Sequence, residues 1–108
     1  MALVMSMATL NQRMGTEKLT KVSELLRVVA HPQRLALLDA LADGERKCNR
    51  ELQELLGIEQ AILSQHLTLM KDRGVLTCSK EGKYTFWVVK RPELLKIISC
   101  MEDCCDKL

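Results

Sequence analysis

Residues 49–74 have the sequence NRELQELLGIEQAILSQHLTLMKDRG, and this stretch decides the fold. Leucines recur at helical spacing on both sides of Gly57, which predicts one helix over residues 49–56 and another from Gln60 to Gly74. Glycine readily adopts the left-handed conformation on which helices end. A short helix, a tight glycine-containing turn and a second helix have the spacing of a helix-turn-helix.

The chain after these two helices is predicted to form a β-hairpin. Residues 75–79 and 84–89 are rich in β-branched and aromatic residues, and the polar run 80–83, Lys-Glu-Gly-Lys, separates them. A hairpin that directly follows the second helix of a helix-turn-helix is a wing. The predicted fold is therefore mainly α with a small β-hairpin, a winged helix-turn-helix.

Two helices are expected before this core and one after it. The first runs from Thr16, its N-cap, to Val29, and the second from Pro32 to Ala42. The element order becomes α-α-α-α-β-β-α. Residues expected to face the core in the first three helices are Leu19, Val22, Leu25, Leu26, Val29, Leu35, Leu38, Leu41, Leu52, Leu55 and Leu56.

The last helix is predicted to begin at Pro92 and to pack on a partner helix. Its apolar stripe has near-heptad spacing, which is typical of helix pairs and favours a homodimer. The stripe consists of Leu94, Ile98, Met101, Cys105 and Leu108.

Length and composition indicate one domain. The 108 residues are 47% apolar, and the formal charge of +2 is too small to indicate nucleic acid by itself. Residues 1–15 are expected to form a flexible arm and 16–108 the domain. No stretch predicts a membrane span or a targeting signal, so we expect a cytoplasmic protein whose five cysteines are reduced.

The second helix of the motif carries the expected DNA contacts. Its core stripe is Leu63, Leu67 and Met70, and the opposite face is short, polar and almost uncharged. Amide and hydroxyl groups on such a face suit the reading of base edges in a major groove, although an ordinary solvated face is the alternative. The residues expected to reach DNA are Gln60, Ala61, Ser64, Gln65 and Thr68.

Two lysines of the wing are also expected to contact DNA, and one histidine is expected to support the helix. Lys80 and Lys83 flank the tip of the wing, where they can contact backbone phosphate; solvated charges on a hairpin tip are the alternative. His66 falls beside the core stripe, which favours a half-buried histidine that supports the helix over one that reads a base.

These features together resemble the ArsR/SmtB family of winged helix-turn-helix repressors. The resemblance implies a repressor, not an enzyme, that binds an inverted-repeat operator in double-stranded DNA. It also implies a homodimer whose interface is formed by the first and last helices. One departure is Glu59, which stands where many relatives have a small hydroxyl residue; we expect it to cap the helix away from the DNA or to narrow the choice of operator. The matching residues are His31-Pro32-Gln33-Arg34-Leu35, Leu52, Leu56, Gln60, Leu63-Ser64-Gln65-His66-Leu67, Gly74-Val75-Leu76 and Glu81-Gly82-Lys83.

The cysteines are the expected input. In the family's arsenic and cadmium sensors a Cys-x-Cys pair begins the third helix; here Cys48 is present but Arg50 replaces the second cysteine. Cys100, Cys104 and Cys105 in the last helix compensate, since the first two lie one turn apart on one flank. Soft thiolates suit As(III), Cd(II) or Pb(II), with Cys48 as a fourth ligand, better than Zn(II), and no cofactor is obligatory.

Other interpretations of the thiols and of the fold stay open at this stage. Oxidation or persulfidation that links Cys48 to the last helix is a second input, and free cysteines also pack as small apolar residues, as we expect for Cys78 in the wing. A thiol oxidoreductase is disfavoured because no Cys-x-x-Cys motif is present. A winged-helix module that binds protein is the alternative from another class.

Overall fold

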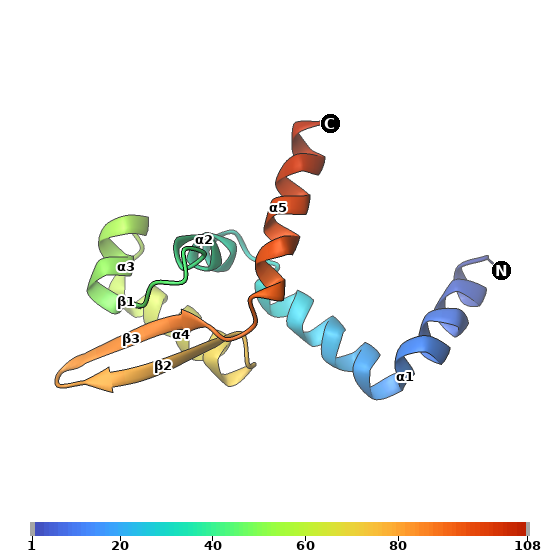
Figure 1. Cartoon of the computed structure of the whole chain (residues 1–108), viewed down its shortest axis with the longest axis horizontal. Coiled ribbons are helices and arrows are strands. Elements are labelled where there is room, and N and C mark those ends of the chain that lie inside the picture. The colour runs from blue at the N-terminus through green and yellow to red at the C-terminus, as the bar shows by residue number, and fades with distance from the viewer. Residues whose placement is uncertain (1, 108) are drawn as a thin grey trace.

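The computed structural model describes the backbone of residues 2–107 and the side chains of residues 12–107. Within this range the β2–β3 hairpin extends to one side of the helices, and α1 and α5 leave the core in other directions (Figure 1). The predicted winged helix-turn-helix is confirmed. In chain order the elements are α1 Ala2–Val29, α2 Pro32–Ala40, β1 Lys47–Cys48, α3 Asn49–Leu56, α4 Gln60–Asp72, β2 Leu76–Glu81, β3 Tyr84–Val89 and α5 Glu93–Asp106.

The core forms around the buried face of α4. Leu63, Leu67 and Met70 are at most 1% exposed, as their helical spacing predicted. Burial of side chains of this size stabilises the fold by roughly 1.5–3 kcal/mol each. The residues packed around them come from the other four helices, from β2 and β3, and from the turns between elements: Val28, Val29, Leu37, Leu38, Leu41, Leu52, Ile58, Val75, Leu76, Trp87 and Leu94.

Local signals explain where the central helices begin and end. The Nδ1 atom of His31, the N-cap of α2, accepts a hydrogen bond of 3.1 Å from the backbone N–H of Gln33, and Pro32 occupies the first turn. At the other boundary, Gly57 has a φ of 64° and ends α3. Because that φ is left-handed, glycine is the residue best suited to the turn.

The sheet contains one strand that the sequence did not predict. Strand β1 pairs antiparallel with β3, so that Lys47 faces Trp87 and Cys48 faces Phe86, and the strand order is β1-β3-β2. Two residues carry too little periodicity to be recognised, and β1 exists only because β3 offers it a free edge. The same strand joins the wing to the start of α3.

Several predicted boundaries and four predicted core residues differ from the structure. Helix α2 ends at Ala40, α4 ends at Asp72, α5 begins at Glu93 rather than Pro92, and β2 is shifted to Leu76–Glu81. The exposed residues that were expected to face the core are Val22 at 39%, Leu26 at 45%, Leu35 at 38% and Leu55 at 60%. In a short helix, leucines at i+3 and i+4 fit the periodicity equally well, and tertiary packing selects between them.

The N-terminal region also differs from the expectation. Helix α1 was predicted to begin at Thr16, but its backbone is helical from Ala2 onward and is interrupted at Gly15, where φ is 77° and ψ is 159°. The boundary at residue 15 is thus a kink between two helical segments. The flexibility expected of the arm stays a prediction, and Leu108 of the predicted stripe lies outside the described residues.

In residues 2–107, no helix combines the length and the apolar character that a bilayer span requires.

Truncation of Leu67 tests the position of the core. Leu67→Ala removes a fully buried side chain of α4, and we expect the free energy of unfolding to fall by about 2–5 kcal/mol. The matched control is Leu55→Ala, because this leucine is 60% exposed. Urea denaturation followed by circular dichroism measures both; similar losses for the two variants would contradict the assigned helix faces.

Candidate nucleic-acid interface

The face of α4 opposite the core is open to solvent. Gln60, Ala61, Gln65 and Thr68 are exposed and Ser64 is half-buried, which is where their spacing placed them. Helix α4 has no acidic or basic side chain before Lys71 other than the imidazole of His66, which is buried. A short, uncharged surface of amide and hydroxyl groups can approach base edges closely, and contact with DNA stays a prediction for each of these residues.

A groove connects the start of α4 with the wing. It has a volume of about 410 Å³ and brings Gln60 and Lys83 together, although they are far apart in sequence. Arg50 and Gln53 of α3 and Tyr84 of β3 line it as well. None of these three residues was predicted from the sequence to contact DNA. Arg50 and Gln53 are polar residues on the first turns of α3, and Tyr84 lies beside the wing turn. These positions indicate a shared surface only once the wing is folded against α3.

The two wing lysines occupy different settings. Gly82 turns the hairpin with a φ of 61°, and both Lys80 and Lys83 are exposed. The ammonium of Lys83 lies 5.5 Å from the centroid of the Tyr84 ring, at the edge of the groove. Lys83 lines this groove together with residues of α3 and α4, whereas Lys80 does not line it.

An arginine outside the predicted set holds the wing. Arg46 donates two hydrogen bonds, of 2.5 and 2.9 Å, to the carboxylate of Glu81, and its guanidinium lies 4.3 Å from the centroid of the Phe86 ring. The hydrogen bond from Arg46 holds the pKa of Glu81 below its ordinary value. An exposed pair of this kind contributes little stability, but it directs the hairpin. The carboxylate of Glu81 is thereby neutralised at the edge of the wing.

Asn49 and Trp87 provide a second tie between the helix-turn-helix and the wing. The indole N–H of Trp87 donates a hydrogen bond of 2.6 Å to the side-chain oxygen of Asn49, the first residue of α3. Trp87 is only 6% exposed. Because a buried indole N–H needs an acceptor, this bond fixes the start of α3 against β3.

His66 supports α4 from its buried side, as predicted. Its Nδ1 atom accepts a hydrogen bond of 3.2 Å from Nε of Arg34, and Nε2 lies 2.7 Å from the side-chain oxygen of Gln33. Since Nδ1 is an acceptor, Nε2 carries the proton and donates to Gln33. Arg34 also donates to the backbone oxygen of Val28 at 2.9 Å, so the network joins α1, α2 and α4.

The network requires a neutral imidazole. Burial lowers the pKa of His66, and the nearby His31 and Arg34 lower it further. A proton on Nδ1 would face the Nε–H donor of Arg34, and the ring of His31 lies 4.7 Å away between centroids. Protonation of His66 therefore opposes the packing of α4.

Glu59 does not cap α4 with its side chain. It occupies the N-cap position, yet its side chain makes no cap hydrogen bond to the helix and it is exposed. The expectation of a capping carboxylate was wrong, because the extended side chain is free to reach solvent instead. The carboxylate of Glu59 therefore stays exposed at the N-terminal end of α4, beside Gln60.

Cys48 is buried at the junction of β1 and α3. It is 7% exposed, and its backbone N–H donates a hydrogen bond of 3.1 Å to the carboxylate of Glu51. This bond holds the pKa of Glu51 below its ordinary value. The C-terminal half of α5 runs away from β1 and α3 (Figure 1), so a site that combined Cys48 with the last helix would have to form between protomers.

The cysteines of α5 lie on its free half. Leu94 is buried and Ile98 is half-buried, but every residue from Ser99 to Lys107 is exposed. Cys100, Cys104 and Cys105 are therefore accessible free thiols in the protomer. Among the described residues no group of three or more histidine, cysteine, aspartate or glutamate side chains is arranged to hold a metal ion.

Cys78 differs from the terminal thiols. It is half-buried in β2, packs against the hydrophobic core and lies opposite Trp87 in the ladder. These contacts agree with the packing role that the sequence favoured for it.

Comparison with known proteins adds a family to this geometry. Residues 31–77 match the model described as bacterial regulatory protein, arsR family. The chain is 33% identical over 85 residues to a biofilm growth-associated repressor of Agrobacterium fabrum, covering 79% of this chain and 72% of the repressor. Over 82 residues it is 34% identical to the transcriptional repressor SmtB of Mycobacterium tuberculosis, covering 76% of this chain and 60% of SmtB.

Solved structures agree with the fold. HlyU from Vibrio cholerae superposes with a TM-score of 0.73 at 27% identity, covering 82% of this chain and 96% of HlyU. A homodimeric winged helix-turn-helix DNA-binding domain from Mycobacterium bovis superposes with a TM-score of 0.70 at 19% identity, covering 82% of each chain. The second likeness bears on the fold alone.

The neutral state of His66 predicts a dependence of stability on pH. Because the pKa of His66 is lower in the folded than in the unfolded chain, the unfolded chain binds a proton first as the pH falls below about 6.5. Stability should therefore be full above that pH and decline below it. His66→Gln should weaken this decline between pH 7.5 and 5.5, as measured by thermal melting; an equally steep decline in the variant would contradict the assignment.

Proposed function

Since the chain belongs to the arsR family of DNA-binding transcriptional repressors, we propose that it binds an inverted-repeat operator as a homodimer and releases it when a thiophilic ion binds Cys100 and Cys104. The observation that supports the switch is the pair of accessible thiols one helical turn apart on the free half of α5.

The DNA-binding surface combines base readout with phosphate contact. Gln65 and Thr68 on the uncharged face of α4 suit the major groove, where side-chain amides and hydroxyls bond to base edges. Lys83 and Arg50 line the groove beside the start of α4 and are the cations proposed to contact the flanking phosphate backbone; the exposed pair of Arg50 with Glu54, at 3.3 Å, would have to yield to a phosphate. The net charge of +2 does not oppose this function, because the cations that matter are local.

Exposed apolar side chains on α1 and α5 support a homodimer. Val22, Leu26 and Met101 are 39%, 45% and 55% exposed in the protomer. A partner helix would remove this surface from water, and the heptad-like spacing of α5 suits such packing. One of the solved structures with this fold is described as homodimeric, which agrees with the proposed assembly.

The spacing of the two thiols favours a metal over a direct disulfide. Side chains at i and i+4 of a helix have Cβ atoms about 5–6 Å apart, whereas a disulfide requires about 3.5–4.5 Å. Two thiolates at the wider spacing can share one ion. Cys105 and thiolates of the partner subunit would supply the remaining ligands. The ion would then have three ligands in total for As(III) or Pb(II), and four in total for Cd(II) or Zn(II).

Ion binding on α5 acts on DNA through the dimer. Helix α5 packs on α2, which carries Gln33 and Arg34 of the network that supports α4. A dimer geometry that misaligns the two α4 helices is sufficient for release. A coupling free energy of about 1–3 kcal/mol changes operator affinity roughly 5- to 150-fold.

Thiol oxidation is the second candidate for the input. The described residues of one protomer contain no preformed group of three metal ligands, and this favours oxidation. When a persulfide donor has modified both Cys100 and Cys104, the two persulfides can condense to a trisulfide with release of hydrogen sulfide, and the additional sulfur relieves the distance constraint. Both inputs use the same thiols and differ in the reagent that releases DNA.

Substitutions on α4 and on the wing should have different effects on DNA binding. Gln65→Ala should weaken binding to an operator selected from random DNA by about 1–3 kcal/mol and relax its sequence preference. Lys83→Ala should weaken binding to all sequences and reduce the salt slope by about 1. Fluorescence anisotropy at several salt concentrations measures both, with Lys96→Ala on α5 as the control. Binding that does not depend on salt would contradict the operator surface.

The double variant Cys100→Ser, Cys104→Ser tests the switch. It should bind the operator as the unmodified chain does, because both thiols lie away from α4, yet stay bound when As(III) or Cd(II) is added. Cys78→Ser is the matched control and should still release DNA. Anisotropy follows release, and ultraviolet thiolate-to-metal absorption follows ion binding without DNA.

The outcomes separate the two inputs. Release by a persulfide donor but not by As(III), Cd(II), Pb(II) or Zn(II) would replace the metal proposal with thiol oxidation. If the double variant releases DNA as the unmodified chain does, the α5 thiols are not the switch.

A further inference from the structure

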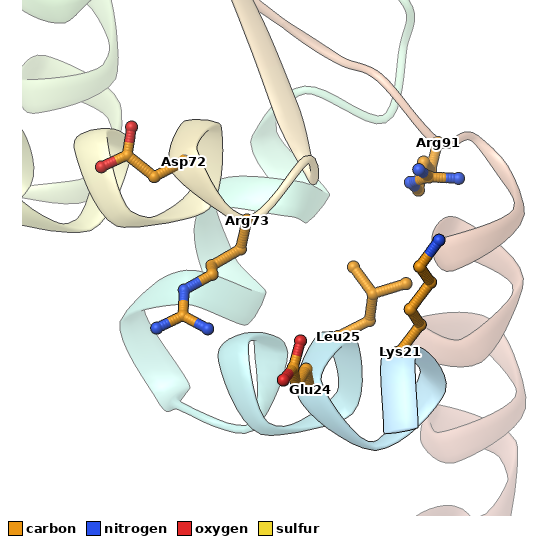
Figure 2. Close-up of a pocket in the computed structure, with 6 residues that line it drawn as sticks. All are labelled: Lys21, Glu24, Leu25, Asp72, Arg73 and Arg91. Atoms are coloured by element: carbon orange, nitrogen blue, oxygen red, sulfur yellow. The ribbon is translucent and has the colours of Figure 1, made fainter. Parts of the chain in front are cut away.

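A pocket opens between α1, the C-terminal end of α4 and the short segment that joins β3 to α5. Its volume is about 270 Å³, below the range of roughly 300–1,000 Å³ that is typical of sites for drug-sized ligands. Figure 2 shows the side chains that line it: Lys21, Glu24, Leu25, Asp72, Arg73 and Arg91.

The charged groups of this pocket are not neutralised by one another. Within residues 12–107, none of the three cations Lys21, Arg73 and Arg91 has a carboxylate within the 4.0 Å of a salt bridge. In Figure 2 the carboxylate of Asp72 points away from Lys21 and Arg91, and Glu24 lies toward Arg73. Glu24 and Asp72 thus line the pocket without pairing with Lys21 or Arg91 among the described residues.

Arg91 is held in position by the backbone. Its Nε–H donates a hydrogen bond of 3.2 Å to the carbonyl of Gly74, in the turn that follows α4. Lys21 extends from α1 toward the guanidinium of Arg91, and Leu25 lies beside it as an apolar wall (Figure 2). Two cations from distant parts of the sequence thus converge on one space, with the terminal N–H groups of Arg91 still available.

The positive charge continues into a neighbouring hollow. Glu24 and Arg73 also line a space of about 250 Å³, together with Arg27 and Arg34. Arg34 is engaged with Val28 and His66, but Arg27 has no salt bridge among the described residues. A chain with a net charge of only +2 concentrates its cations here, at the opposite end of α4 from Gln60.

We propose that this pocket is a binding site for a small anion that carries phosphate or carboxylate oxygens. The guanidinium of Arg91 supplies paired N–H donors that match such oxygens, Lys21 supplies a point charge opposite, and Leu25 borders an apolar part of the ligand. The site is separate from the thiols of α5, and its existence does not depend on the proposed switch.

A bound anion would join three elements of the repressor. It would connect α1 to Arg91 before α5 and, through the Arg91–Gly74 hydrogen bond, to the end of α4. These elements set how the dimerisation helices sit relative to the DNA-contacting helix, so occupancy of the pocket offers a second input besides the thiols.

The test is a titration of the full chain with inorganic phosphate and with citrate, followed by the backbone amide NMR signals of Gly74 and Arg91. Sodium chloride at matched ionic strength is the reference. We expect saturable shifts at these amides, and Lys21→Gln should weaken the binding at least fivefold. Lys18→Gln, an exposed change one turn earlier on α1 and outside the pocket, should leave it unchanged.

Three results would overturn the proposal. The first is a shift that does not saturate or that sodium chloride reproduces. The second is an equal loss in the Lys18 and Lys21 variants, which would indicate general screening. The third concerns the DNA backbone as the alternative anion: if Lys21→Gln lowers operator affinity and the salt slope in buffer without phosphate or citrate, the cations contact DNA and the pocket is not a separate site.

Discussion

The position of α4, the helix proposed to contact DNA, depends on the hydrogen bonds of one buried histidine. His66 accepts from Arg34 and lies against Gln33, while Arg34 also reaches the backbone of Val28. The apolar stripe of α4 selects the face that is buried, but hydrophobic burial has no direction. The hydrogen bonds do have a direction, and they tie α4 to α1 and α2 at specific atoms. In the proposed homodimer, a change in geometry that moves α1 or α2 would reach α4 through the same atoms.

The two ends of α4 have different environments. Gln60 at its start adjoins the groove formed with Arg50 and Lys83, whereas Arg73 after its end lies in a pocket with Lys21. Cations near the C-terminal end of a helix also interact favourably with its dipole, which contributes to their presence there. The two clusters together explain how a chain of low net charge can present strong local charge at two separate places.

Much of the candidate interface follows from periodicity. The exposure of Gln65 and the burial of Leu67 are consequences of a period of 3.6 residues, which is visible in the sequence. Arg50 and Tyr84 could not be assigned in this way, because they share a surface only after β1 has paired with β3. The exposure of Leu55 was missed for a related reason: in a helix of eight residues, periodicity does not choose between neighbouring leucines.

The sequence by itself determined the order of the main helices, the wing and the exposed face of α4, because helical periodicity, glycine at the turns and β-branched residues in the hairpin are local properties. Tertiary structure alone decided the strand β1, the Arg46–Glu81 tie, the network of His66 and the meeting of Lys21 with Arg91. Each of these joins residues distant along the chain, and such pairings depend on how the elements pack rather than on any local pattern.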